Sequence, residues 1–229
     1  MGKRRLIGKI VILMLGLAAV VILAANNDTI PVSTPKKGYR VVIDPGHGGS
    51  DCGAVGVSGV KEAGLNLAVS LYLKEELEAL GMEAILTRSD ERALAEGKKA
   101  DMAARGKIMN GEGVDLVVSV HMNKFTDPSV HGPMAFYMKG SAEGEKLAKT
   151  VIDSITDELG APRRIANPGD YYVIRESMPV SVLVECGFLS NSGDEALLQQ
   201  EQHQKKLAHA IARGIFSYFE GDLGRKPLD

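Results

Sequence analysis

The sequence predicts an α/β fold, in which helices pack on both faces of a sheet. Short apolar runs rich in β-branched residues alternate with longer segments whose apolar residues recur every three or four positions. One run, at 116–120 (LVVSV), is apolar almost throughout, as is typical of an interior strand covered on both faces. The chain has 229 residues, 45% of them hydrophobic, which is enough for one catalytic domain with a sizeable core.

These patterns place the elements in chain order. In the first half we expect strand 41–44, helix 63–80, strand 83–87, helix 101–110 and strand 116–120. Pro45 and Gly46 stop the first strand, and Gly81 ends the apolar stripe of the first helix. In the second half we expect strand 134–138, helix 142–159, two short strands at 172–174 and 180–184, and a final helix at 202–219. Strands and helices therefore alternate along the whole domain.

The N-terminus, residues 1–25, is a separate segment. A basic start at residues 3–5 precedes residues 10–25, which carry no charged or strongly polar side chain. Counted back to Leu6, the segment has about the ~20 residues that span a bilayer. The basic flank predicts a membrane anchor that leaves the rest of the chain outside the cytoplasm. A cleaved signal peptide, giving a secreted protein, is the alternative, although Leu23 makes a poor cleavage site.

Residues 26–38 are rich in Asn, Thr, Pro, Ser and Lys and predict a linker before a catalytic domain at 39–221. The whole chain has a net charge of −2, and without the four basic residues among its first nine it has 23 basic against 29 acidic residues. Such a surface argues against nucleic acid as a partner. Export permits a disulfide between the two cysteines, Cys52 and Cys186, but two buried thiols fit equally well, and we expect free thiols.

Polar side chains follow three of the expected strands. His47 lies in a glycine-rich loop after the first strand, His121 ends the third, and Glu185 ends the strand at 180–184. Because open α/β sheets gather their chemistry at the carboxyl ends of the strands, we expect these groups at one edge. Glu62, at the start of the helix after the loop, can point to the same edge. Alternatively, it is an ordinary first-turn acid that complements the helix dipole.

Two histidines and one carboxylate with an open fourth position are the ligand set of a hydrolytic zinc site. Zinc lowers the pKa of bound water to about 7 and polarises a scissile carbonyl. A second carboxylate is then needed to carry the proton, and the residues alone leave open which of Glu62 and Glu185 does so. The loop lacks the spacing of nucleotide-binding motifs. The remaining histidines have no comparable setting: His131, His203 and His209.

Four ordered motifs resemble those of the zinc-dependent N-acetylmuramoyl-L-alanine amidases of the amidase 3 family: DPGHGG at 44–49, KE at 61–62, SVHMN at 119–123 and VECGFLSN at 184–191. The resemblance covers about residues 39–219 and implies a twisted, mainly parallel sheet of about six strands. It also implies zinc ligands and a catalytic glutamate, which are His47, Glu62 and His121, and Glu185. Asn123 and Arg175 lie near motif positions that orient substrate, although Arg175 could instead be a surface ion-pair residue.

The implied reaction is hydrolysis of the amide between the lactyl group of N-acetylmuramic acid and the L-alanine of the peptidoglycan stem peptide. Residues 138–146 pass from strand to helix without room for the inserted helix that closes the cleft of regulated division members, so we expect an open cleft. We also expect no wall-binding module. These features, with FLSNSGDEALL at 188–198, resemble the germination-specific members that prepare spore cortex for muramic-δ-lactam formation.

Two other interpretations of the function are kept open. The first is a cell-separation or autolytic amidase, which would share the chemistry and differ in its biology. The second is a non-catalytic wall-binding protein that keeps the fold without turnover. The sequence does not identify a protein partner.

Overall fold

The computed structural model describes residues 38–162 and 165–223. The predicted membrane segment at 1–25 lies outside them, as does the predicted linker except for Gly38. Among the described residues, no helix is both long enough and apolar enough to cross a bilayer.

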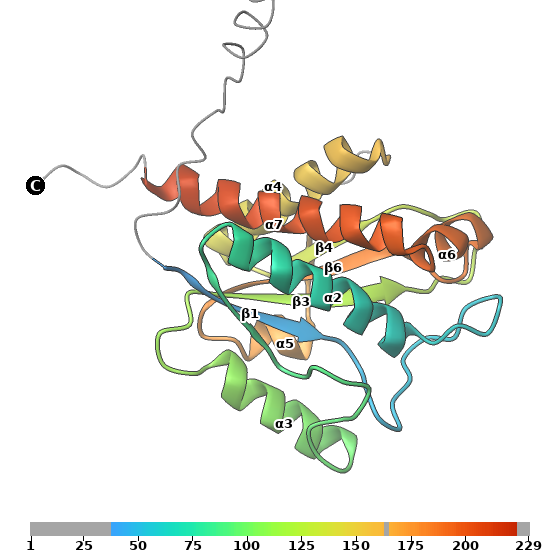
Figure 1. Ribbon diagram of the computed structural model, residues 1–229, viewed down its shortest axis with the longest axis horizontal. Helices are drawn as coiled ribbons and strands as arrows, with labels where there is room; N and C mark the ends of the chain where they lie inside the picture. The colour runs from blue at the N-terminus through green and yellow to red at the C-terminus, as the bar shows by residue number, and fades with distance from the viewer. Residues whose placement is uncertain (1–37, 163–164, 224–229) are drawn as a thin grey trace, which may run out of the picture. The chain divides into compact units, whose positions relative to one another are not determined.

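The described residues form strands and helices that alternate over most of the chain, which confirms the predicted α/β class (Figure 1). In chain order they are β1 (Arg40–Pro45), α2 (Glu62–Ala79), β2 (Glu83–Leu86), α3 (Lys98–Met109), β3 (Leu116–Asn123), β4 (Met134–Met138), α4 (Ala142–Leu159), β5 (Asn167–Gly169), α5 (Tyr172–Arg175), β6 (Val180–Phe188), α6 (Ser192–Leu198) and α7 (Glu201–Leu223).

The strands form one six-stranded sheet in the order β2-β1-β3-β6-β4-β5. Strand β1 pairs in parallel with β2 and β3, and β3 pairs in parallel with β6. Strand β4 runs antiparallel to β6 and carries β5 parallel to itself at the sheet edge. The sheet is therefore mixed and mainly parallel, as the resemblance implied.

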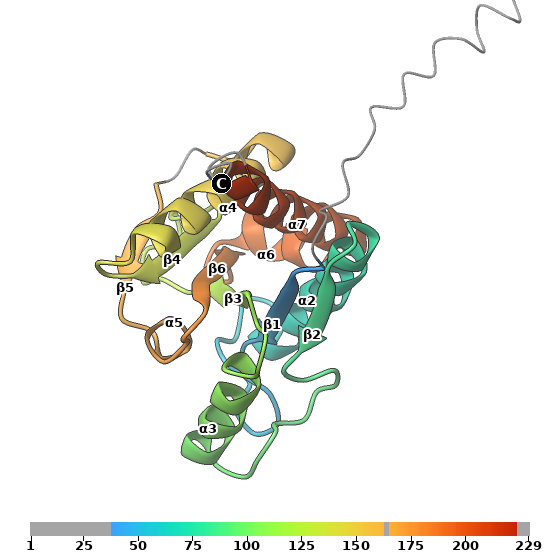
Figure 2. The same cartoon turned by 90° about the vertical axis from the view of Figure 1, so that its left-hand side faces the viewer.

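Helices cover both faces of the sheet, as predicted. Helices α2, α4 and α7 lie on one face, and α3 and the short α5 lie on the other (Figures 1 and 2). Because side chains alternate along a strand, Val41 and Ile43 of β1 point into the larger core under α2, α4 and α7, whereas Val42 joins a smaller core on the α3 side. The smaller cover on the second face leaves room for a cavity there.

Residues 172–174 are helical, so the strand predicted for them is wrong. They begin α5, and the edge strand is instead β5, at 167–169. Val173 and Ile174 are both buried in the smaller core. Successive residues of a strand point to opposite faces, whereas successive residues of a helix point only about 100° apart, so both can contact one core. Pro168 in β5 suits an edge strand, where a missing N–H leaves no gap in the ladder.

The connection from β4 to α4 is short, as predicted, because β4 ends at Met138 and α4 begins at Ala142. Ser141 caps α4, since its Oγ accepts a hydrogen bond from the Gly144 amide at 3.0 Å. The helix ends at Gly160, whose φ of 60° is the left-handed conformation typical of a helix C-terminus. No inserted helix separates these two elements.

Candidate active site

The sheet brings the predicted site residues together at the carboxyl ends of three parallel strands. In the register of β3 and β6, His121 lies opposite Glu185, so both side chains point to the α3 and α5 face. The loop after β1 carries His47 to the same edge, and the amide of Gly46 donates to the carbonyl of Val120 at 3.0 Å. Glu62 reaches the edge from the first residue of α2.

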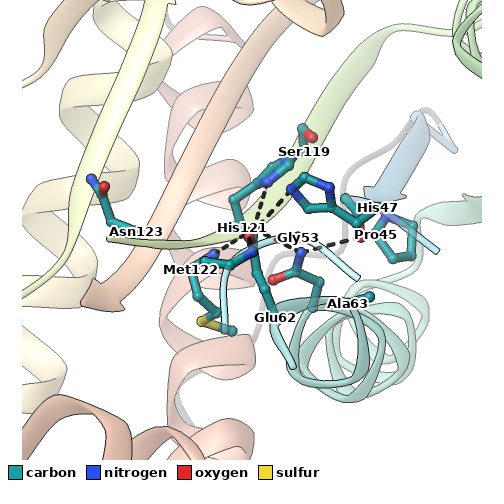
Figure 3. A network of polar contacts seen from close by, with 12 residues as sticks. Pro45, His47, Gly53, Glu62, Ala63, Ser119, His121, Met122 and Asn123 are labelled. Carbon is teal, nitrogen blue, oxygen red and sulfur yellow. Dashed lines mark hydrogen bonds and ion pairs between the residues drawn. The ribbon is translucent and has the colours of Figure 1, made fainter. Parts of the chain in front are cut away.

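His47, Glu62 and His121 point toward one another (Figure 3). One ligand atom from each lies within 4.8 Å of the other two. Oε2 of Glu62 is 3.3 Å from Nε2 of His47, and Oε1 is 2.9 Å from Nδ1 of His121. The two imidazole rings are 5.1 Å apart at 80°. Two imidazoles and one carboxylate within this distance form a donor set that suits a divalent ion such as zinc.

Glu62 is buried and held as a carboxylate. Its oxygens accept hydrogen bonds from the amides of Ala54, at 2.7 Å, and Met122, at 3.3 Å, and from Nδ2 of Asn66, at 3.2 Å. Burial alone would raise the pKa of Glu62, but its hydrogen bonds and charge interactions with His121 and His47 outweigh burial and lower that pKa far below its usual range. An ionised oxygen ligand is therefore available at neutral pH.

His47 is fixed by its backbone and by a second carboxylate. Its φ of 61° lies in the left-handed region, which a residue with a side chain rarely adopts. Nδ1 of its ring is 3.0 Å from Oδ1 of Asp51, four residues along the chain. A carboxylate on the outer nitrogen of a ligand histidine is a common way to fix the ring and its tautomer. Burial lowers the pKa of His47, but Glu62 and Asp51 outweigh it and raise that pKa.

Two glycines make room for the ligand side chains. A Cβ on Gly46 would lie 2.2 Å from Cε1 of His121, and a Cβ on Gly53 would lie 2.4 Å from Oε2 of Glu62. Both distances are far below van der Waals contact. The glycine-rich motif thus allows the β1 loop to pass directly against the two side chains it faces.

Glu185 has the surroundings of a proton-transfer group. Its side chain is buried at 7% exposure, and its Oε2 has no hydrogen-bond partner among the described residues. Burial and the nearby charge of Glu62 raise the pKa of Glu185 to about 7, although His121 and His47 act in the opposite direction. A carboxyl with a pKa near neutrality can both accept and return a proton.

The two cysteines are free thiols, as predicted. Cys186, the neighbour of Glu185, points to the opposite face of β6 and is buried in the larger core. Burial raises the pKa of its thiol, which makes it a packing residue. The remaining histidines stay outside the cavity lining: His131 lies between β3 and β4, His203 and His209 lie on α7, and His209 pairs with Glu76 at 2.8 Å.

A cavity of about 450 Å³ opens over the cluster. Its lining includes all four predicted ligand and catalytic residues together with Asn123, Lys98, Lys124, Tyr171 and Tyr172. Arg175 is not part of this lining. Its guanidinium is exposed and forms ion pairs with Asp170 and Glu176. The structure therefore places Asn123 at the site and Arg175 on the surface beside it.

Three residues that shape the site were not found in the sequence analysis. Asp51 stands four residues after His47, and Asn66 stands four residues after Glu62 on α2, so their spacing was a usable signal. Tyr171 was hidden because the segment around it was assigned to a strand. Burial and the charge of Glu185 raise the pKa of Tyr171, and both residues line the cavity.

The chain was compared with known proteins. The family model described as N-acetylmuramoyl-L-alanine amidase matches residues 41–217, a span that contains the whole cluster and Glu185. The germination-specific N-acetylmuramoyl-L-alanine amidase of Bacillus subtilis (strain 168) is 34% identical over 205 residues, which cover 85% of this chain and 86% of that protein. N-acetylmuramoyl-L-alanine amidase LytC of the same organism is 31% identical, and the match covers 82% of this chain and 37% of LytC.

Among solved structures, the CwlD amidase from Clostridioides difficile, in complex with the GerS lipoprotein, superposes with a TM-score of 0.77. It is 32% identical in sequence, and the match covers 80% of this chain and 100% of that one. Sequence and structure therefore agree over the same domain. The chain belongs to the N-acetylmuramoyl-L-alanine amidases of the amidase 3 family, hydrolases that act on the peptidoglycan of the cell wall.

Proposed function

We propose that this amidase depends on a zinc ion held by His47, Glu62 and His121. The observation that carries the proposal is the convergence of these three side chains, from a loop, a helix and a strand, to within 4.8 Å. The set matches the ligands of hydrolytic zinc sites, and the lowered pKa of Glu62 supplies its anionic member. When bound, zinc supplies an acidified water and a polarised substrate carbonyl.

In this proposal Glu185 is the general base and then the general acid. Glu185 lines the cavity, and its Oε2 has no hydrogen-bond partner among the described residues, so in this proposal the carboxylate takes a proton from the attacking water. Attack on the lactyl carbonyl breaks the bond to the nitrogen of L-alanine, and Glu185 returns the proton to that nitrogen. We further propose that Asn123 orients the substrate, because it lines the cavity two residues after His121. For Arg175 we propose the surface ion pair instead.

The test is turnover of defined muropeptides by the purified full chain, with free stem peptide measured by mass spectrometry and zinc content measured in parallel. Glu185→Gln should keep its zinc and lose about 10²–10⁴-fold in kcat, since the amide cannot serve as a base. Glu158→Gln, an exposed glutamate near the end of α4, is the matched control and should behave as wild type. Normal turnover by Glu185→Gln contradicts the role proposed for this residue.

We propose that the biological role is in the spore cortex, where removal of the stem peptide precedes muramic-δ-lactam formation. Support comes from the 34% identity to the germination-specific amidase, which this chain matches over 86% of its length. Expression of this chain in Bacillus subtilis lacking that amidase should restore lactam to the cortex, and Glu185→Gln should not. If lactam stays absent while wild-type protein restores separation of vegetative daughter cells in an autolysin mutant, the cell-separation role is correct instead.

We propose that the chain is anchored at the membrane through residues 1–25 and works there with a protein partner. Residues 10–25 form an apolar run, and one relative was solved in complex with a lipoprotein. Full chain extracted from membranes with a mild detergent should migrate in native gels well above its mass of 24.4 kDa, with a second polypeptide. Recovery as a monomer in the soluble fraction contradicts both proposals.

A further inference from the structure

Two buried arginines lie behind the loop that carries His47. Arg105, on α3, is 1% exposed, and Arg88, just after β2, is 3% exposed. Fully buried arginines are rare and need partners for their charge and their N–H groups. The groups that accept hydrogen bonds from Arg88 and Arg105 indicate the role of these two arginines in the protein.

Both side chains donate to the backbone of the same short segment. Arg105 donates to the carbonyl of Pro45 at 2.7 Å and to the carbonyl of His47 at 2.5 Å. Arg88 donates to the carbonyls of Pro45, at 3.0 Å, and Gly46, at 2.8 Å. Three consecutive carbonyls, from Pro45 to His47, are thus held by two guanidinium groups.

The guanidinium groups of the two arginines have different kinds of partner. Arg105 forms ion pairs with Asp44, at 2.9 Å, and Asp101, at 2.7 Å. The hydrogen bonds of Arg88 in the described part of the chain all go to backbone carbonyls, including those of Ala63, at 2.9 Å, and Asp90. A simple structural ion pair therefore accounts for Arg105 in part and does not account for Arg88.

The segment that the two arginines hold, Pro45–His47, includes a residue with a strained backbone. His47 has a φ of 61°, a conformation that is strained for a residue with a Cβ. The orientation of the peptide groups before and after His47 sets the direction of its Cα–Cβ bond. Fixing the carbonyls of Gly46 and His47 therefore fixes where the imidazole points, which is toward Glu62.

We propose that Arg88 and Arg105 are positioning residues of the amidase site, which hold the backbone at Pro45–His47 so that the His47 imidazole is directed at Glu62 before any ion binds. The effect on the loop stands on the contacts above. The effect on zinc affinity rests, in addition, on the proposed zinc site.

The experiment uses the full chain with Arg88→Lys and Arg105→Lys. Each variant keeps the buried charge, but one ammonium group cannot reach all the carbonyls that a guanidinium spans. Arg40→Lys is the matched control, because Arg40 is a partly exposed arginine that bonds Glu83 and the carbonyl of Glu112 away from the site. Ile152→Val, in the larger core, controls for a general loss of stability.

Two quantities are measured for each protein. The first is amide hydrogen exchange of the metal-free protein at Gly48 and Gly49, whose N–H groups bond the carbonyls of Asp51 and Glu91. The second is the Kd for zinc, measured by competition with a chelator. Both site variants should exchange faster at these two amides and bind zinc about 10–100-fold more weakly. Arg40→Lys and Ile152→Val should keep the wild-type zinc Kd, even where Ile152→Val lowers the unfolding midpoint.

The possible outcomes distinguish the positioning role of the arginines from the proposed zinc site. If wild type binds zinc and both arginine variants keep its exchange rates and its Kd, the positioning role is wrong while the zinc site stands. If wild type binds no zinc, the zinc site is wrong, and the exchange rates alone decide whether the arginines hold the loop. If Arg105→Lys does not fold, because Asp44 loses part of its pairing, Arg88→Lys decides the question, since it leaves the ion pair between Asp44 and Arg105 intact.

Discussion

At the scale of single residues, the sequence predicted which side chains gather at the ends of the strands, but it did not predict the residues that support them. His47, His121 and Glu185 were found because each follows a strand-like run, and Glu62 because it opens the next helix. Arg88 and Arg105 gave no such signal, since each donates to backbone carbonyls that are distant along the chain, Gly46 for Arg88 and Pro45 for Arg105. Contacts of this kind follow from the tertiary structure and not from local sequence patterns.

Gly46 offers the sharpest test of the crowding around His121. Gly46→Ala would place a Cβ 2.2 Å from the imidazole, so the ring or the loop must shift. We expect the zinc Kd to rise at least tenfold, measured by chelator competition. Gly64→Ala is the matched control, because a Cβ there meets nothing within 4 Å and lies inside α2. It should keep the wild-type Kd and raise the free energy of unfolding by roughly 0.5–1 kcal/mol. Unchanged affinity in Gly46→Ala contradicts the packing described for His121.

At the scale of elements, the strand predicted at 172–174 was wrong, and the reason is physical. The run at 172–174 has β-branched residues and the length of a short strand, so its composition alone favoured a strand. What decides its structure is the burial of both Val173 and Ile174 on one side, which only the packed protein defines. The long helix α4 was predicted to the residue, and α2 and α7 were predicted with small errors at their ends, because their apolar spacing extends over several turns.

The helical form of this segment predicts different roles for two of its residues. Tyr171 lines the cavity, and its ring packs against Phe136 with centroids 5.1 Å apart, whereas Arg175 points to solvent. Tyr171→Ala should lower kcat/KM for muropeptides about tenfold, equivalent to about 1.4 kcal/mol of lost transition-state binding. Arg175→Ala should stay within about twofold of wild type. The reverse ranking of the two variants would place Arg175 in substrate binding.

At the scale of the whole molecule, the larger core and the candidate active site lie on opposite faces of the sheet. The larger core lies under α2, α4 and α7, while the α3 and α5 face holds the smaller core, the cavity and the site. The sequence predicted this α/β arrangement because strands and helices alternate, and parallel strands then align their carboxyl ends. It could not predict the register of β3 and β6, which places His121 beside Glu185.

The burial of Glu185 predicts how the stability of the metal-free protein depends on pH. Its pKa in the folded protein is raised to about 7, from an ordinary value of 4.5. Between these pH values the folded chain binds more protons than the unfolded chain, so the contribution of Glu185 to stability decreases as pH rises. Glu185→Gln removes this loss. In urea unfolding, the free energy of unfolding of Glu185→Gln should exceed that of wild type. The difference should grow from pH 5 to pH 7, to about 1–3 kcal/mol, and then level off.

The lowered pKa values of Asp44 and Glu62 have the opposite consequence. For Asp44, burial opposes ionisation, but the charge of Arg105 and the hydrogen bonds of Thr87 and Ser119 outweigh it. The stability from such groups is present above the unfolded pKa, near 4, and is lost as pH falls below it. It therefore lies outside the window from pH 5 to pH 7. A constant difference between Glu185→Gln and wild type across that window contradicts the raised pKa of Glu185.

The most direct measurement is anomalous diffraction at the zinc edge from crystals of the zinc-loaded protein. We predict one peak at the carboxyl edge of the sheet, with His47, Glu62 and His121 as the protein ligands and with Glu185 near the ion but not bound to it. A peak ligated by other residues, or an ion that binds Glu185 in place of Glu62, would contradict the site and the roles given to its two glutamates.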